Sequence, residues 1–187
     1  AVVIGGGIIG VATAFWLSRA GLSTILVEMR DGLSTLTTTA SIESFRAQFT
    51  DPAMAALAKE SIDVWENFAQ TTGLEGYEID LHHGGYLFLT TEADMMAEVK
   101  ATVEAYHKVG VTDSEYLSGD EVHNRWPWLN PEIKAGAFRA KDGWFSAHEV
   151  TQGFARAADK ARFYVRTRAT GIETDSQGVC AVNTDRG

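Results

Sequence analysis

The first 28 residues contain two short apolar runs that flank a longer apolar stretch. Residues 1–4 and 23–28 resemble strands, while residues 8–20 are apolar almost all round, as in a helix packed against a sheet. Gly21 supplies a helix end. The run at 23–28 is continuous rather than alternating, which is typical of a parallel strand covered on both faces. We therefore expect a strand–helix–strand unit at the start of the chain.

A polar segment rich in serine and threonine follows at residues 30–50 and predicts a long loop, which in a compact domain is usually functional. A helix is then expected from Pro52, with Asp51 as its N-cap, to Gly73. Its apolar residues recur at helical spacing and are expected to face the core. They are Met54, Leu57, Ala58, Ile62, Trp65 and Phe68.

The rest of the chain mixes strand and helix signals. Serine or threonine followed three positions later by an acid predicts helix starts at Thr91–Asp94, Ser118–Glu121 and Ser146–Glu149. The first of these helices is expected to reach Gly110, and the last to end near Ala161. A turn is expected at 142–143. The predicted strands are 77–81, 85–90, 135–140, 162–168, 171–174 and 179–184.

This order predicts an α/β fold with two interleaved domains. A Rossmann-like domain is expected to comprise residues 1–76 and 141–187, and an insert with a mixed sheet to comprise residues 77–140. Only four residues precede the first glycines, and the turn at 185–187 has no following strand. We therefore expect the sequence to be the N-terminal part of a longer, truncated chain.

Composition restricts the partners. A formal net charge of −9, with basic residues interspersed among acids, argues against nucleic-acid binding. The single cysteine, Cys180, excludes an internal disulfide, favours a cytoplasmic location and is expected to pack within a strand. No transmembrane segment is expected, because polar residues interrupt the apolar stretch near Gly21. No metal site is expected, because the adjacent His82 and His83 would point to opposite faces of a strand, one buried and one exposed.

Gly5, Gly7 and Gly10 match the pattern G-x-G-x-x-G between a strand and a helix. The first glycine permits a tight turn, the second lets a diphosphate approach the backbone, and the third lets the helix pack on the strand. The helix start adds free N–H groups and a positive dipole end. Glu28, at the tip of the second strand, can accept both hydroxyls of an adenosine ribose and would repel a 2′-phosphate. The motif predicts an adenine dinucleotide site that disfavours NADP.

The choice between NAD and FAD depends on the segments that come after the motif. An NAD domain of this type usually continues with alternating strands and helices, whereas this chain inserts a polar loop, a long helix and a strand pair. Taken in order, its segments resemble the FAD-dependent D-amino-acid oxidase and sarcosine oxidase superfamily, which includes sarcosine and dimethylglycine dehydrogenases, glycine oxidase and proline dehydrogenase subunits. The segments are "VVIGGGIIGVATAFWLSRAGLSTILVE", "TTTASIESFR", "HHGGYLFLTTEAD", "AKDGWFSAHEVTQGFARAA" and "TRATGIETDSQGVCAVNTDRG".

The resemblance covers nearly the whole chain and about the first half of a family member. It implies FAD contacts for the diphosphate, the ribose, the adenine and the flavin. The implied residues are Gly5, Gly7, Ile8, Ile9 and Gly10 at the diphosphate, Glu28 at the ribose, Met29, Arg30 and Ala169 at the adenine, and Thr38, Thr39 and Ser41 beneath the flavin. The FAD is expected to be non-covalent, because residues 39–41 hold no histidine where some relatives attach it.

The resemblance also assigns Arg46 to the substrate carboxylate, which suits a bidentate guanidinium. A surface ion pair with Glu43 or Asp51 is the alternative. The implied reaction is oxidation of the C–N bond of a small amine, imino acid or amino acid by hydride transfer to flavin, with oxygen or a carrier as electron acceptor. A 2-hydroxy-acid or glycerol-phosphate dehydrogenase and a non-catalytic FAD-binding subunit of a complex remain open. Trp126, Trp128 and Trp144 are assigned to a substrate pocket, to core packing or to a subunit contact.

Overall fold

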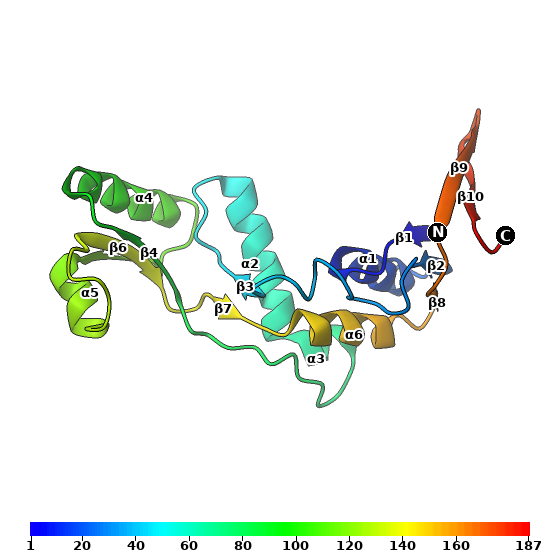
Figure 1. Cartoon of the computed structure of the whole chain (residues 1–187), viewed down its shortest axis with the longest axis horizontal. Coiled ribbons are helices and arrows are strands. Elements are labelled where there is room, and N and C mark those ends of the chain that lie inside the picture. The colour runs from blue at the N-terminus through cyan, green and yellow to red at the C-terminus, as the bar shows by residue number, and fades with distance from the viewer. The chain divides into compact units, whose positions relative to one another are not determined.

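The computed structural model describes all residues from Ala1 to Gly187 and forms two compact units. The first unit comprises residues 1–43, 68–80 and 145–187, and the second comprises residues 44–67 and 81–144 (Figure 1). The predicted domains divided the chain at other points. The helix-bearing segment 44–67 lies in the second unit, because its residues pack and hydrogen-bond with the segment 81–144.

The first unit is built on a parallel sheet with strand order β1-β2-β8. Its strands are β1 (Val2–Ile4), β2 (Thr24–Val27) and β8 (Ala161–Tyr164). The helices α1 (Ile8–Arg19) and α6 (Ala147–Ala157) pack together, with the rings of Phe15 and Phe154 5.0 Å apart. Leu26 is fully buried beneath them. The strand–helix–strand unit expected at the start of the chain is confirmed.

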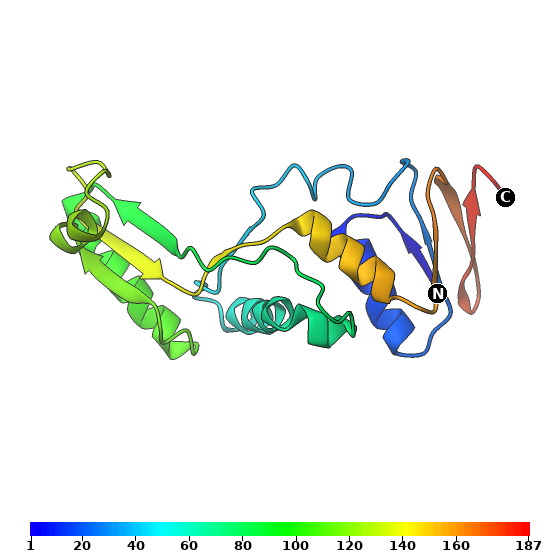
Figure 2. The same ribbon diagram turned by 90° about the horizontal axis from the view of Figure 1, so that it is seen from below.

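The opposite face of this sheet is exposed at Ile25 but covered at Val27, which lies on the same face of β2 and is 5% exposed. The registers place Val2, Ile25 and Arg162 side by side, and Ile25 is 38% exposed. The expectation that β2 is covered on both faces is therefore wrong at Ile25, because both helices pack on the side of Leu26. The hairpin of β9 (Ala169–Asp175) and β10 (Gly178–Thr184) lies on the other side (Figure 2). Cys180 of β10 is exposed, which corrects the expected packed position.

The single helix expected from Pro52 to Gly73 is two helices, α2 (Pro52–Glu66) and α3 (Phe68–Thr72). Asp51 caps α2 as expected, since its carboxylate accepts the N–H of Met54 at 2.9 Å. Ala55 and Ile62, two turns apart, are the buried positions of α2. The expected core stripe is therefore wrong at Met54 and Leu57, which are 46% and 59% exposed.

The second unit contains an antiparallel sheet with order β4-β6-β5. Its strands are β4 (Tyr86–Thr90), β5 (Glu115–Ser118) and β6 (Ala135–Arg139). The helices α4 (Met96–Lys108) and α5 (Gly119–Arg125) flank this sheet (Figure 1). A mixed sheet was expected, but every pairing here is antiparallel. Two short strands, β3 (Ser44–Phe45) and β7 (Gly143–Trp144), pair with each other outside this sheet.

Several expected elements differ because of local backbone conformation. Residues 77–81 form no strand, since Asp80 has a φ of 53°, which breaks an extended run. Tyr77 instead donates to a carboxylate oxygen of Glu149 at 2.8 Å, and burial together with this bond raises the pKa of Tyr77 to about 12. The strand expected at 162–168 ends at Tyr164, because Arg166 also has a φ of 53°.

Two of the three expected capping pairs are confirmed. Ser118 and Glu121 form a complete capping box, and Ser146 accepts the N–H of Glu149. The Thr91–Asp94 pair is wrong: a 3₁₀ turn, η1 (Ala93–Met95), precedes α4 and has Glu92 as its N-cap. The hydroxyl of Thr90 accepts the Glu92 N–H.

Three shorter expectations also need correction. The turn expected at 142–143 lies at residues 140–141, because Gly143 belongs to β7. The helix expected to end near Ala161 ends at Ala157. His82 and His83 are both exposed, because they lie outside a regular strand. Among the helices, none has the length and apolar content needed to cross a membrane.

Candidate functional site

The loop between β1 and α1 has a backbone that only glycines can form. Gly5 has a φ of 107°, and its N–H donates to the carbonyl of Val27 at 2.9 Å, which ties the loop to β2. A Cβ on Gly10 would lie 2.0 Å from the Gly5 carbonyl oxygen. The turn and the first turn of α1 are therefore in direct backbone contact, as the spacing of the glycines predicts.

The N-terminus of α1 presents backbone donors at this loop. Its N-cap, Gly7, has no side chain, and the N–H of Ile8 donates to the Thr38 hydroxyl at 3.2 Å. The N–H groups of Ile9 and Gly10 have no partner within the helix, and Ile9 is 79% exposed. The positive end of the helix and these donors together suit an anion.

Glu28 lies beside the same loop. One oxygen of its carboxylate accepts the N–H of Gly6 at 2.6 Å, and the other accepts the N–H of Arg30 at 2.7 Å. A carboxylate has about four lone-pair positions, so each oxygen keeps one for a further donor. Glu28 thus both fixes the glycine loop and offers two acceptors at the tip of β2.

The polar loop after β2 folds back onto the glycines. The N–H of Ser34 donates to the Gly6 carbonyl at 2.8 Å, and the buried Ser34 hydroxyl has no hydrogen-bond partner. The hydroxyls of Thr39 and Ser41 donate to carbonyls of their own loop. Of the three polar residues predicted here, Thr38 alone bonds the helix start. Sequence reasoning missed Ser34, although it lies in the loop already singled out.

The remaining predicted adenine contacts lie near Glu28. Met29 and Arg30 are exposed, directly after β2. The backbone that leads to Ala169 passes alongside them, since Arg166 and Thr167 donate to the carbonyls of Arg30 and Glu28 at 2.6 and 2.8 Å. Ala169, the first residue of β9, is half-buried. The first unit thus brings the predicted glycines, Glu28, Thr38 and these residues into one region.

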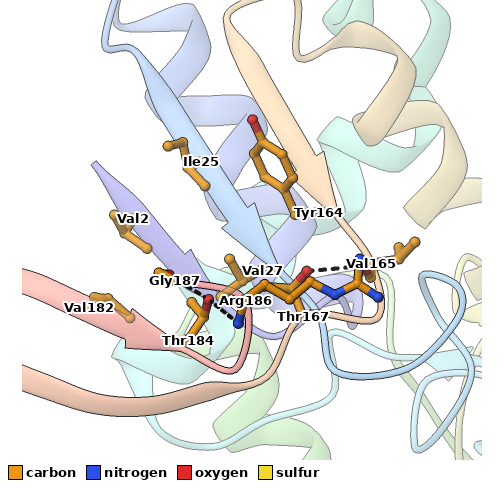
Figure 3. A pocket seen from close by; sticks show the side chains of 10 residues that line it. All are labelled: Val2, Ile25, Val27, Tyr164, Val165, Thr167, Val182, Thr184, Arg186 and Gly187. Carbon is orange, nitrogen blue, oxygen red and sulfur yellow. Dashed lines mark hydrogen bonds between the residues drawn. The ribbon is translucent and has the colours of Figure 1, made fainter.

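A separate cavity of about 450 Å³ lies on the Ile25 face of the first unit's sheet (Figure 3). Apolar residues of β1, β2 and β8 form one side, and the end of the β9–β10 hairpin forms another. Polar atoms there bond each other: Thr184 accepts the Arg186 N–H at 3.1 Å and donates to the Gly187 carbonyl at 2.7 Å. None of the predicted site residues lines this cavity.

Arg46 lies in the second unit, directly after β3. Its guanidinium carbon is 4.7 Å from the ring centre of Phe49, 5.5 Å from that of Tyr86 and 5.4 Å from that of Phe88. Its Nε is buried without a hydrogen-bond partner, and no ion pair involves Arg46. The alternative of a surface ion pair is therefore absent. Aromatic faces attract a cation but supply no hydrogen-bond acceptor in the guanidinium plane.

Arg46 and the buried Asp142 act on the pKa of Tyr106 in opposite directions. Burial raises the pKa of the Tyr106 hydroxyl on α4, and the Arg46 cation opposes that rise. Of the tryptophans left open by the sequence, Trp126 packs against Phe138, Trp144 stacks on His82, and Trp128 is 77% exposed. Arg46, the residue predicted to bind the substrate carboxylate, is therefore surrounded by three aromatic rings and has no ion-pair partner.

Residues 1–187 match the DAO family, which is described as FAD dependent oxidoreductase. The chain thus belongs to this family of FAD-dependent oxidoreductases, as the sequence resemblance predicts. It is 28% identical to "FAD-dependent oxidoreductase domain-containing protein 1" of Mus musculus over 94% of this chain and 38% of that protein. It is also 28% identical to glycine oxidase of Bacillus licheniformis, over 95% of this chain and 48% of that enzyme.

Among solved structures, L-proline dehydrogenase from P. horikoshii superposes on the whole chain with a TM-score of 0.87 and 28% identity. The match covers 49% of that enzyme. The predicted α/β, Rossmann-like fold is thereby confirmed as the fold of this family. The chain spans between about two-fifths and half of the length of these relatives.

Proposed function

We propose that the chain forms the FAD-binding part, and some of the substrate domain, of an enzyme that oxidises the C–N bond of a small amine, imino acid or amino acid. The first unit would bind FAD, and the second would bind substrate. Oxygen or an electron carrier would accept the electrons. The net charge of −9 argues against a nucleic-acid partner. The single cysteine supports a cytoplasmic location. Assembly as an oligomer or as a subunit of a complex is compatible with this role.

The residues present fit an adenine dinucleotide. The side-chain-free loop from Gly5 to Gly10 and the N–H groups of Ile9 and Gly10 suit the diphosphate. The remaining lone pairs of Glu28 suit the ribose hydroxyls. Thr38 would link the helix start to the flavin side of the loop. Bound FAD would supply the hydride acceptor, and these residues would hold and orient it.

The main observation in favour of a substrate with a carboxylate is the Arg46 cation, which has no ion-pair partner. A half-buried guanidinium without an anionic partner is rare, because burial of an unpaired charge is unfavourable. A substrate carboxylate would complete it with two charge-assisted hydrogen bonds. That interaction would orient an amino or imino acid, whose C–N bond is oxidised. A 2-hydroxy acid would present the same carboxylate, and bleaching of the flavin by one class of substrate and not the other distinguishes the two.

The visible spectrum of the full-length protein tests the proposal. A flavin band at about 450 nm is expected after purification. Without oxygen, N-methylglycine, proline or a D-amino acid is expected to bleach it, whereas lactate and glycerol 3-phosphate are expected to leave it unchanged. Bleaching by the hydroxy compounds alone would instead identify a dehydrogenase of that class. A flavin band that no small substrate bleaches would indicate a non-catalytic subunit.

A further inference from the structure

A buried carboxylate, that of Asp142, bonds the residues next to Arg46 but not Arg46 itself. Its side chain is fully buried. One oxygen accepts the N–H of Ala47 at 2.9 Å and the Nη1 of Arg139 at 2.5 Å. The other accepts the side-chain Nε2 of Gln48 at 3.1 Å. Asp142 therefore bonds both residues that directly follow Arg46.

These bonds fix the backbone at Arg46 relative to β4. Ala47 is fully buried, Gln48 is 3% exposed, and the Gln48 Nε2 also donates to the carbonyl of Tyr86 at 2.9 Å. Tyr86 and Phe88 of β4 provide two of the rings against which the guanidinium lies. The Asp142 carboxylate thus bonds the backbone next to Arg46 and the Gln48 amide, which in turn bonds the strand that holds the Arg46 side chain.

The charge of Asp142 is balanced by Arg139 rather than by Arg46. Arg139 also bonds Asp113 through its Nε at 2.7 Å and its Nη2 at 3.1 Å. Burial tends to lower the pKa of Arg139, but its bonds to Asp113 and Asp142 hold that pKa above the ordinary value. A buried ion pair of this kind is stabilised by its full set of hydrogen bonds. The cation of Arg46 therefore stays available for another anion.

We propose that Asp142 is a positioning residue that holds Arg46 in place for the carboxylate of the substrate. The inference rests on the proposed role of Arg46. Loss of the Asp142 bonds would free residues 47–48 and let the guanidinium leave its aromatic faces. Ligands that carry a carboxylate would then bind more weakly, whereas ligands without one would be unaffected.

Calorimetric titration of the full-length protein with paired probes tests this inference. Each carboxylate probe is matched with its counterpart that lacks the group: glycine with methylamine, N-methylglycine with dimethylamine, and proline with pyrrolidine. Asp142→Asn is expected to weaken binding of the carboxylate member by at least about tenfold, on the scale of one lost charged hydrogen bond. The amine member is expected to change by less than about twofold.

A second variant guards against misfolding of Asp142→Asn, which leaves Arg139 with one fewer counter-charge. Gln48→Met keeps the side-chain length and the Asp142–Arg139 pair but removes the donor to Asp142 and Tyr86. It is expected to weaken carboxylate binding by a few-fold, with the same selectivity. Asp113→Asn is the matched control, because Asp113 bonds Arg139 but no residue of 46–48. It is expected to leave both probe classes unchanged.

The Arg46→Ala variant distinguishes a failure of the positioning role from a failure of the proposed function. If Arg46→Ala abolishes the preference for carboxylates but Asp142→Asn and Gln48→Met do not affect it, the positioning role is wrong and the proposed function stands. Equal losses for carboxylate and amine probes in the Asp142 and Gln48 variants would likewise overturn the positioning role. If Arg46→Ala has no effect, or the unaltered protein binds no probe, the proposed function fails and the inference fails with it.

Discussion

Replacement of Gly10 by alanine is expected to yield a full-length protein without bound FAD and with reduced stability. The new Cβ would lie 2.0 Å from the carbonyl oxygen of Gly5. That oxygen belongs to the backbone of a turn whose φ at Gly5 is 107°, so it cannot move aside as a side chain could. Either α1 must shift or the turn must open, and overpacking of this kind costs about 1–3 kcal/mol or more.

The ratio of flavin absorbance to protein absorbance measures the first effect, and thermal unfolding of the flavin-free protein measures the second. Gly171→Ala is a matched control in the same unit. A Cβ there would approach the Asn183 side chain no closer than 3.7 Å, an ordinary contact, and we expect normal FAD content. A Gly10→Ala protein that retains a full complement of FAD would refute the proposed role of the loop.

Arg46→Ala is expected to lower kcat/KM for the carboxylate substrate by roughly 10- to 150-fold. This range corresponds to the loss of about 1.5–3 kcal/mol from a hydrogen bond to a charged group. Arg46→Lys is expected to recover only part of the activity, because an ammonium cannot form the bidentate pair. Steady-state kinetics with the substrate identified by flavin bleaching provide the measurement.

Arg125→Ala is the control for loss of an arginine from the same unit. Arg125 pairs with Glu115 at 2.7 Å, and both side chains are more than 40% exposed. Exposed pairs contribute little, so its kinetics are expected to change by less than about twofold. Unchanged kinetics in Arg46→Ala would remove the carboxylate role from this residue.

The glycine loop was predictable because its signal is local. The positions of Gly5, Gly10 and Glu28 depend on one strand, one turn and one helix within 28 residues, and each glycine has a steric reason. The caps at Asp51, Ser118 and Ser146 were predictable for the same reason, since a cap joins residues three positions apart.

The surroundings of Arg46 could not be predicted in this way. Asp142 and Ala47 are 95 residues apart in the chain, and β3 pairs with β7 across a similar distance. Such contacts leave no periodic pattern, so the Asp142–Gly143 dipeptide indicated a turn and nothing more. The short strand β5 went unnoticed because its pairing with β6 depends on tertiary contacts rather than on propensity.

The Ile25 face of the first sheet shows a similar limit. The run at Ile25, Leu26 and Val27 is apolar on both sides, and this pattern alone indicates burial on both sides. In the structure, α1 and α6 cover Leu26, while Ile25 borders the cavity beneath the β9–β10 hairpin. The hydrophobic pattern therefore identified the strand but not the elements that cover each of its faces.

A crystal structure of the full-length protein with FAD tests the central claim most directly. We predict that diphosphate oxygens accept hydrogen bonds from the N–H groups of Ile9 and Gly10, and that the ribose hydroxyls donate to the Glu28 carboxylate. FAD bound at another place, with the loop from Gly5 to Gly10 covered by side chains, would contradict the account.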